Sequence, residues 1–385
     1  MVYAARLTVL GSLNMDISVT VPELPVPGAT VLGRAAVFAP GGKGANQAVA
    51  AARLARDAGM PVAMVGCTGD DEFGRTLREA LRAEGIDDSR VRTVAGAPTG
   101  IAMITVDHAG ENMITVAPGA NREVGTADIT AVHPAWSHPA LSSPDAAGSA
   151  ASVPAASNAF RDVLVISAEV PIPVISAALA ESAGRALRVL NLAPAPSPAE
   201  AAELVAAGPE WLVVNESEAA AVLGRTVAGL AEAAGAAADL VTAGARNAVV
   251  TAGAAGAAYC GPQAAGDART PGDARPPVDA RPAADARPAG HARPAGDARP
   301  PAADRPGVIT VPGFKVTAVD TVGAGDTFVG ALAVALGAGV PPVDAVTAAA
   351  AAGAAAAARP GTQSGMPRPS DVLAATGHHW PVTER

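Results

Sequence analysis

Short apolar runs recur along the chain and alternate with longer stretches that have helical periodicity. Apolar runs bounded by small or polar residues are typical of buried parallel strands. Their alternation with helices predicts an α/β fold: a three-layer α/β/α domain with a mostly parallel central sheet. The predicted central strands are 6–10, 62–67, 163–167, 188–191, 211–214 and 248–251. The clearest predicted helices are 45–56, 72–84, 327–336, 342–358 and one from about Ser370.

A different pattern, with apolar and polar residues alternating, marks strands that lie outside these units. Residues 17–21 and 30–39 alternate in this way, and prolines separate the two runs. Residues 99–106 and 112–116 predict a hairpin whose turn is Asp107–Gly110. We expect these strands, within about 16–39 and 99–117, to form a small β-sheet lid beside the main domain. A further strand pair is predicted at 256–260 and 308–311.

Two segments lack the composition of a folded core. Residues 134–158 are rich in Ser, Ala and Pro and have no periodicity. Residues 262–307 contain a repeat in which Asp-Ala-Arg begins at 267, 273, 279, 285 and 297, with prolines between the units. Such tracts have almost nothing to bury, so we predict disordered insertions within a single domain that spans residues 1–385.

Charge and composition exclude several classes of function. The net charge of −9 and the pI near 5.2 argue against general nucleic-acid binding, which needs a basic surface. Cys67 and Cys260 end strand-like runs and have the character of buried thiols in a reducing compartment. The apolar stretch 329–358 is broken by Pro341, Pro342 and Asp344, which disfavours a membrane span. We expect a soluble cytoplasmic protein that does not bind membranes.

The stretch Asp320–Gly330 carries the strongest chemical signal. Gly323 and Gly325 predict a tight turn that places Asp326 in the first turn of an apolar helix. Amide groups at a helix start lack intrahelical acceptors and bind anions, so those of Ala324, Gly325 and Asp326 predict an anion site. A carboxylate beside it suggests a base for phosphate chemistry. The alternative is a plain helix cap, a position that Asp commonly occupies.

A second glycine-rich helix start lies at Gly41–Gln47. Gly42, Lys43 and Asn46 there would suit a ligand rich in hydroxyl groups. The spacing differs from that of a Walker A sequence. An ordinary helix cap is the alternative interpretation, although one glycine would be enough for it.

Polar residues also follow several predicted strands, at the edge where ligands of open α/β sheets bind. Asn14 and Asp16 face the same way in extended chain, unless they form an Asx turn. Glu169 follows strand 163–167, where a carboxylate would suit a ligand site. A solvated acid in a loop is an equally good interpretation of the same position. Asn215 and Glu218 share a face at a helix start, where they would hold hydrated Mg²⁺ or simply complement the helix dipole.

Three of these motifs occur together, in order and widely separated. They are Gly41-Gly42-Lys43-Gly44-Ala45-Asn46-Gln47-Ala48, Asn215-x-x-Glu218 and Asp320-Thr321-x-Gly323-Ala324-Gly325-Asp326-Thr327-Phe328. In this combination the chain resembles the ribokinase-like carbohydrate kinases, also called the PfkB family. The resemblance covers about residues 7–367, outside the two low-complexity segments.

The resemblance implies transfer of the γ-phosphate of ATP to a sugar hydroxyl, O5 in the case of D-ribose, giving the 5-phosphate and ADP. Asp326 would be the general base, and the Gly323–Asp326 turn would bind the transferring phosphate. The matching sugar-site residues are Asn14, Asp16, Gly42, Lys43, Asn46 and Glu169. The matching nucleotide-site residues are Asn215, Thr251, Ala252, Gly253, Ala254, Ala255, Gly256, Gly325 and Asp326.

Two metal ions and a homodimer are also implied by the resemblance. Glu218 would organise Mg²⁺ through water, and a monovalent cation, K⁺ in most relatives, would lie beside the anion turn. The family often has a serine where Gly365 stands here, with Ser364 displaced by one position, which leaves that ligand open. Paired lids imply the homodimer. The matching K⁺ positions are Asp320, Val322, Ala356, Arg359, Gly361 and Gly365.

Other functions remain open from the sequence. Within the family, 2-deoxyribose, fructose or adenosine would be alternative substrates, although Phe38, the one aromatic residue of the lid segments, makes a poor platform for a base. A non-catalytic regulator that binds a sugar or nucleotide is a hypothesis from a different class, which the intact Asp326 opposes. A dinucleotide oxidoreductase ranks lowest, because no G-x-G-x-x-G follows the first strand.

Overall fold

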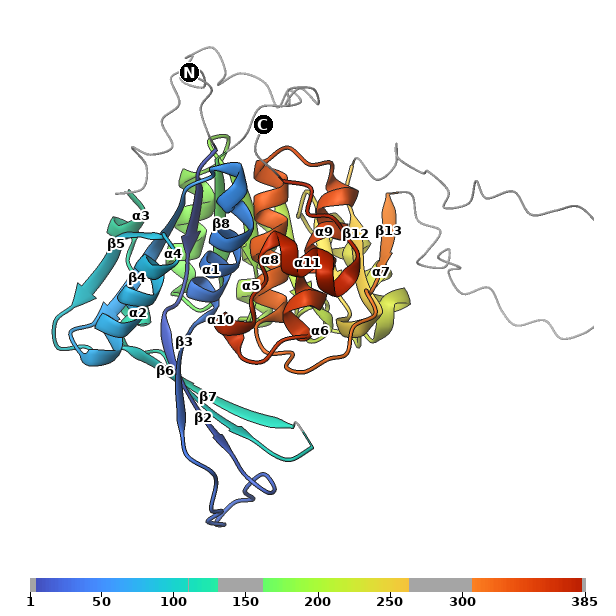
Figure 1. The fold of residues 1–385 in the computed structure, drawn as a ribbon. Helices are drawn as coiled ribbons and strands as arrows, with labels where there is room; N and C mark the ends of the chain where they lie inside the picture. Colours follow the sequence, from blue (N-terminus) through green and yellow to red (C-terminus); the bar gives the residue numbers. More distant parts are fainter. Residues whose placement is uncertain (1–4, 110, 131–161, 263–306, 383–385) are drawn as a thin grey trace, which may run out of the picture.

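The computed structural model describes residues 5–109, 111–130, 162–262 and 307–382. The two predicted insertions, 134–158 and almost all of 262–307, lie outside these residues. In the described chain, nine strands form the central sheet (Figure 1). Their order across the sheet is β13 (Val308–Pro312), β12 (Gly256–Cys260), β11 (Ala248–Thr251), β10 (Trp211–Asn215), β9 (Leu187–Asn191), β8 (Val163–Ser167), β1 (Leu7–Leu10), β4 (Val62–Gly69) and β5 (Asp87–Val94).

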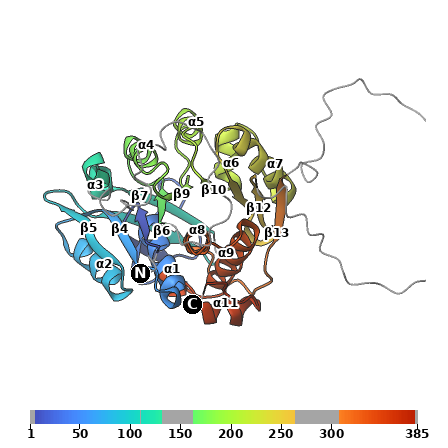
Figure 2. The same cartoon turned by 90° about the horizontal axis from the view of Figure 1, so that it is seen from above.

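The central sheet is parallel except at β12, which runs antiparallel to both β11 and β13. Its inner strands, such as β1, β4 and β8, are completely buried because helices cover both faces, as Figure 2 shows from above. One face carries α1 (Lys43–Ala55), α2 (Glu72–Ala83), α8 (Ala324–Gly337), α9 (Pro342–Ala357) and α11 (Pro369–Thr376). The other carries α3 (Thr126–Thr130), α4 (Ile172–Glu181), α5 (Pro198–Ala206), α6 (Glu216–Leu223) and α7 (Gly229–Thr242).

Two apolar clusters, one on each side of the sheet, make the core. One cluster packs α1, α8 and α9 against the sheet. The other packs the four helices α4, α5, α6 and α7 against the opposite face. Many of the buried side chains are alanines, which let helices approach closely. The predicted three-layer α/β/α fold class is therefore confirmed.

A small sheet stands off the main body at the bottom of Figure 1. β2 pairs parallel with β6, while β3 and β7 pair antiparallel at the two edges. The hairpin predicted at 99–116 is confirmed by β6 and β7. In order, the strands are β3 (Val37–Gly41), β2 (Asn14–Thr20), β6 (Gly100–Val106) and β7 (Asn112–Ala117).

Parts of the strand prediction were wrong. The strand expected at 30–39 is β3, which begins only at Val37, and residues 29–36 form no strand. Pairing with β2 extends only from Asn14–Gly41 to Ser18–Val37, so the earlier residues have no ladder to join. β5 was missed, because it is an edge strand whose polar residues hide the apolar alternation.

The strand order reverses between β1 and β8. From β1 the chain builds the sheet outward through β4 to β5, whereas from β8 it builds the other way through β9 to β11. Crevices outside the carboxyl ends of strands at such a reversal are the usual ligand sites of open α/β sheets. The fold therefore places the residues after Leu10 and Ser167 at the centre of the most favourable crevice.

Candidate active site

Asp326 is the third residue of α8 and is 9% exposed. The helix is capped by Gly323, whose φ of 80° is in the left-handed region that favours glycine. The alternative of Asp326 as a plain N-cap is therefore wrong. Its carboxylate makes no capping hydrogen bond and instead accepts hydrogen bonds from α1.

The turn before α8 keeps part of the predicted anion site. The amide of Ala324 lacks an acceptor within the helix, as expected, but donates to the Thr321 carbonyl of the preceding turn at 3.2 Å. The tight turn itself causes this bond. In the described chain, the amides of Gly325 and Asp326 have no backbone acceptor outside the helix. A side chain at Gly325 would meet no atom within 4 Å, so the turn is open on that side.

Two neutral amides from α1 hold the Asp326 carboxylate. Asn46 Nδ2 donates to Oδ2 at 2.9 Å, and Gln47 Nε2 donates to Oδ1 at 3.1 Å. Asn46 Oδ1 in turn accepts from Gln363 Nε2 at 3.1 Å. The helix start predicted at Gly41–Gln47 is confirmed, since Gly42 (φ 89°) is the N-cap of α1.

The crevice between β1 and β8 is bridged by Glu169. Its carboxylate accepts from the Ser12 hydroxyl, which follows β1, and from the backbone amide of Lys43 at 3.2 Å. Glu169 is thus an acceptor at the start of α1, and the solvated-loop alternative does not apply. Gly11 and Gly44 allow the close approach, because a Cβ on Gly44 would lie 2.7 Å from the Gly11 Cα.

Asn14 and Asp16 lie in β2 and face the same side, so the Asx-turn alternative is wrong. Asn14 Oδ1 accepts from Asn121 Nδ2 at 2.8 Å. The Asp16 carboxylate accepts no hydrogen bond from the described residues and lies where a Cβ on Gly41 would be, at 2.2 Å. Glycine at position 41 is therefore required to make room for the acid.

Lys43 is the cation among four acids. The nearby Asp326 carboxylate raises the pKa of Lys43, burial lowers it, and Glu169, Glu218 and Asp16 raise it again. Burial, followed by Glu169 and Asp326, raises the pKa of Asp16 to about 7. Burial also raises the pKa of Glu169 and of Glu218, which Lys43 partly offsets. These mutual influences show that Glu218 faces the same site as Asp326.

The predicted nucleotide residues come together at the ends of two neighbouring strands. Asn215 of β10 pairs in register with Thr251 of β11. Asn215 and Glu218 form a capping box with two bonds of 2.8 Å, the structural alternative that the sequence left open. The segment 252–256 is a short 3-10 turn, Gly253–Ala255, that leads into β12.

The predicted cation segments are joined by one carboxylate. Asp320 Oδ1 accepts from the Val322 amide and Oδ2 from the Gly361 amide, both at 3.0 Å. A Cβ on Gly365, in α10 (Thr362–Gly365), would lie 3.2 Å from the Arg359 carbonyl and 3.3 Å from that of Pro360. Carbonyl oxygens therefore converge on Gly365, and the Ser364 hydroxyl is engaged by the Pro360 carbonyl at 3.2 Å. The Ala356 carbonyl accepts from the Arg359 amide at 3.0 Å.

Comparison with known proteins decides the family. A model of the pfkB family carbohydrate kinases matches residues 4–286 and 302–369 of this chain. The chain belongs to the pfkB family. The resemblance inferred from three motifs is thereby confirmed, and the members compared below are similar to this chain in sequence or in fold.

Two pfkB-family ribokinases match in sequence. That of Staphylococcus aureus is 35% identical over 217 residues, which is 56% of this chain and 62% of that protein. That of Haemophilus influenzae is 49% identical over 115 residues, which is 30% of this chain and 36% of that protein. The matched segments therefore span less than two thirds of the length of either relative.

Solved structures of the family match over nearly the whole chain. A ribokinase from Thermotoga maritima has a TM-score of 0.68 and 27% identity, covering 97% of this chain and 99% of that one. The ribokinase of Arabidopsis thaliana, complexed with ribose and ATP, has a TM-score of 0.67 and 25% identity, covering 97% and 98%. The carbohydrate-kinase fold therefore extends across both sheets.

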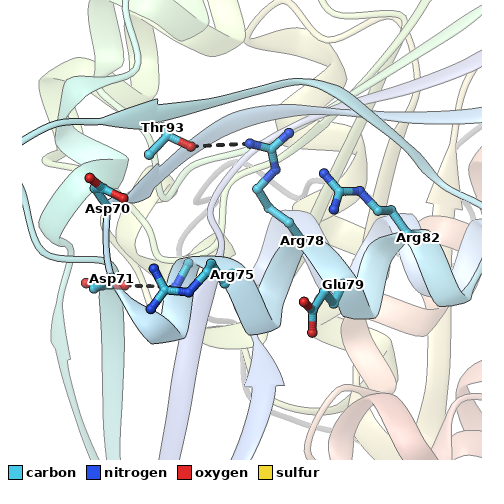
Figure 3. Close-up of a pocket in the computed structure, with 9 residues that line it drawn as sticks. Asp70, Asp71, Arg75, Arg78, Glu79, Arg82 and Thr93 are labelled. Carbon is cyan, nitrogen blue, oxygen red and sulfur yellow. Dashed lines mark hydrogen bonds between the residues drawn. The ribbon is translucent and has the colours of Figure 1, made fainter.

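A hollow of about 250 Å³ lies beside α2 and is lined by none of the candidate site residues (Figure 3). Arg78 and Arg82 line it, and both pair with Asp88, at 2.7 and 2.8 Å. Arg75 pairs with Glu72 at 2.6 Å. The guanidinium groups are thus satisfied by neighbouring carboxylates, and we assign no ligand to the hollow.

The described residues contain no cluster of His, Cys, Asp and Glu arranged to hold a metal ion. Within those same residues, no helix has the length and apolarity needed to cross a membrane.

Sequence reasoning missed several polar residues of the site. Ser12 and Asn121 have no distinctive pattern, and their roles depend on contacts more than a hundred residues away. Asn191 and Gln363 are also long-range partners. Gln47 follows Asn46 directly in the glycine motif, but only the structure shows that its amide is completely buried, where an amide without hydrogen-bond partners would be costly.

The raised pKa of Asp16 predicts a pH dependence of stability. Between its ordinary value of 3.8 and about 7, the folded chain binds a proton that the unfolded chain has released. The free energy of unfolding therefore falls as pH rises through this window. Asp16→Asn removes the buried charge and should stabilise the protein by about 1–3 kcal/mol at pH 8 and by a clearly smaller amount at pH 5, where only part of the window has been crossed.

Urea denaturation at the two pH values measures this difference. Asp57→Asn, at an exposed position, serves as the matched control and should change neither value. An equal effect of Asp16→Asn at both pH values would contradict the assignment of the titration to Asp16.

Proposed function

We propose that this chain is an ATP-dependent ribokinase that transfers the γ-phosphate of ATP to O5 of D-ribose, giving D-ribose 5-phosphate and ADP. One observation carries the proposal: a buried carboxylate, Asp326, is oriented by two neutral amides at the open glycine turn of a helix N-terminus. Similarity to the Arabidopsis thaliana ribokinase, whose structure is complexed with ribose and ATP, supports the choice of substrates.

Asp326 would accept the proton from the attacking sugar hydroxyl. Its two oxygens accept one protein hydrogen bond each, and a carboxylate has further lone pairs for the substrate. The free amides of Gly325 and Asp326, at the positive end of α8, would stabilise the charge that develops on the transferring phosphate. Lys43 supplies a positive charge beside the same carboxylate. Positioning and electrostatic stabilisation supply most of the rate in such transfers.

The sugar would lie among the polar groups at the crevice. Asp16, with no hydrogen bond from the described residues, is available to sugar hydroxyls. The other sugar-site residues come from the same region: Asn14 lies in β2, Gly42 is the N-cap of α1, Lys43 and Asn46 lie in α1, and Glu169 follows β8 and accepts from the Lys43 amide. A site that pairs hydroxyls in this way rejects analogues that lack them, because its buried polar groups would be left without partners.

The nucleotide would lie against the ends of β10 and β11, on Asn215, Thr251 and the small-residue turn Ala252–Gly256. Glu218 fits an indirect role toward Mg²⁺, because it is a buried carboxylate facing Lys43 and Asp326, with one oxygen engaged by the Asn215 amide. Mg²⁺ bound with the nucleotide would neutralise phosphate charge. Glu218 would hold its water shell.

The donor set near Gly365 suits a monovalent cation. K⁺ is a weakly hydrated ion that backbone carbonyls bind well. Carbonyls of Arg359 and Pro360 converge there, and Asp320 ties the 320–322 turn to Gly361. The remaining positions, Ala356 and Val322, lie on the same two segments.

The small sheet would act as a lid and as a dimer interface. Among the described residues, most of the exposed large apolar side chains lie on β3, β6 and β7. They are Val37, Phe38, Met103, Met113, Ile114 and Val116, each 45–59% exposed. Because successive side chains of a strand point to opposite faces, Ile114 and Val116 lie on one face of β7 and Met113 on the other. Exposed apolar side chains gathered on one small sheet are typical of an interaction surface. We propose a homodimer formed through this sheet, and a cytoplasmic location remains a prediction from the sequence.

Two other functions remain as alternatives. A pfkB-family kinase for another sugar or a nucleoside would use the same base and the same turn. A non-catalytic regulator would keep the pocket without needing the oriented carboxylate.

Purified protein should phosphorylate ribose with ATP faster than 2-deoxyribose, fructose or adenosine, because Asp16 and Asn46 match vicinal hydroxyls. A coupled assay of ADP release measures all four rates. If ribose were the poorest substrate, the specificity assignment would be wrong.

Asp326→Asn tests the proposed role of Asp326 as the general base. It preserves size and removes the base, so turnover should fall by at least about 10²-fold, while ribose binding measured by calorimetry stays nearly unchanged. Undiminished turnover would refute the role of Asp326.

Addition of K⁺ to a Na⁺-only buffer should raise kcat several-fold, and Asp320→Asn should weaken this response, because it loosens the link between the 320–322 turn and Gly361. Asp344→Asn, at an exposed position on α9, is the control and should respond like the wild type. Absence of any K⁺ response would remove the cation site from the proposal.

Ile114→Lys combined with Val116→Lys should convert a dimer to a monomer, because both side chains lie on one face of β7. Sedimentation velocity measures the change. A wild-type chain that sediments as a monomer at micromolar concentration would rule out the interface.

A further inference from the structure

Gln47 lies at the centre of a buried chain of amides that ends at Asp326. Its Nε2 donates to Asp326 Oδ1 at 3.1 Å and to Asn191 Oδ1 at 3.0 Å. Both acceptors are oxygens, and the Gln47 Oε1 has no hydrogen-bond partner among the described residues. Turning the amide over would place oxygen against two oxygens, so only one orientation of Gln47 is compatible with its neighbours.

The orientation originates in the central sheet. Asn191 Nδ2 donates to the Val213 carbonyl of β10 at 3.1 Å, so its Oδ1 must face Gln47. Each amide therefore fixes the next, from a backbone carbonyl of the sheet to the carboxylate on α8. Asn191 is 6% exposed and Gln47 is 0% exposed, so water has little access to compete for these bonds.

Close packing of α1 on α8 allows the amide side chains of α1 to contact the Asp326 carboxylate. A Cβ on Gly330, one turn after Asp326, would lie 2.7 Å from the Gln47 carbonyl and 2.9 Å from the Ala50 Cβ. Glycine at this position lets the two helix backbones approach. Without that approach the short amide side chains of α1 would not contact the carboxylate.

We propose that Gln47 is a positioning residue for the reaction: together with Asn46 it holds the plane of the Asp326 carboxylate, and Asn191 holds Gln47. The inference rests on the proposed function, since it assigns to Gln47 the task of orienting the base. Neutral donors suit this task, because they fix the carboxylate without neutralising the charge that a base needs. Gln47 contacts Asp326 and would act on the substrate only through it.

Gln47→Met keeps the length of the side chain and removes the donor. It should lower kcat with ribose by about 10–100-fold, the cost typical of a small misplacement of a reacting group, while the KM for ribose changes less than about 3-fold. The decisive measurement is the effect of Gln47→Met on kcat in the wild type and in the Asp326→Asn variant. In Asp326→Asn, Gln47→Met should cause no further fall in the slow residual rate of transfer. An equal fold-loss in both backgrounds would overturn the proposal.

Asn247→Leu is the control for a purely structural effect. Asn247 is also a buried bridging amide, bonded to Tyr259 and to the Glu210 carbonyl at 2.8 Å each, and it has no link to Asp326. It should lower the thermal midpoint and leave kcat unchanged. A fall in its kcat comparable to that of Gln47→Met would assign the effect to general stability and contradict the proposal.

Asn191→Ala tests the same chain if Gln47→Met fails to fold. It leaves Gln47 in place and removes the group that orients it, so kcat should fall several-fold with the ribose KM retained. Unchanged kcat in a folded Asn191→Ala would contradict the proposal. The two levels of inference fail separately: a wild-type chain that does not phosphorylate ribose refutes the proposed function, whereas an active wild type with a fully active Gln47→Met refutes only the role of Gln47.

Discussion

The hydrogen bonds from Asn46 and Gln47 to Asp326 are the interaction on which the site depends. They join the first turns of two helices that lie 279 or more residues apart in sequence. A buried carboxylate without partners is costly, and two neutral donors offset that cost without removing its charge. The same bonds fix the position of the carboxylate. In the proposed reaction the Gly330 contact, which lets α1 and α8 approach, would therefore serve the chemistry as well as the packing.

The reversal of strand order between β1 and β8 places the rest of the site around this pair of helices. Ser12 follows one strand and Glu169 the other, and their hydrogen bond closes the crevice between them. Glu169 also accepts from the Lys43 amide, so the start of α1 is anchored to the same crevice. One topological feature thus positions residues from three distant parts of the chain.

The electrostatics of the site follow from this crowding. Four acids share one half-buried cation, Lys43, and burial raises the pKa of Asp16, Glu169 and Glu218. An excess of carboxylates is unfavourable in the free protein. In the proposed reaction, the hydroxyls of the sugar and the Mg²⁺ bound with the nucleotide would offset this excess.

Local patterns determined the elements and the family of this protein. Strands, most helices and the two glycine turns depend on periodicity and on backbone freedom, which neighbours in sequence control, so Gly42 and Gly323 were placed correctly as helix starts. The edge strand β5 was missed because its apolar alternation is weak. Ser12, Gln47, Asn191 and Gln363 were decided only by the tertiary structure. Their partners lie far away in sequence, and a polar residue has no role until packing brings a donor and an acceptor together.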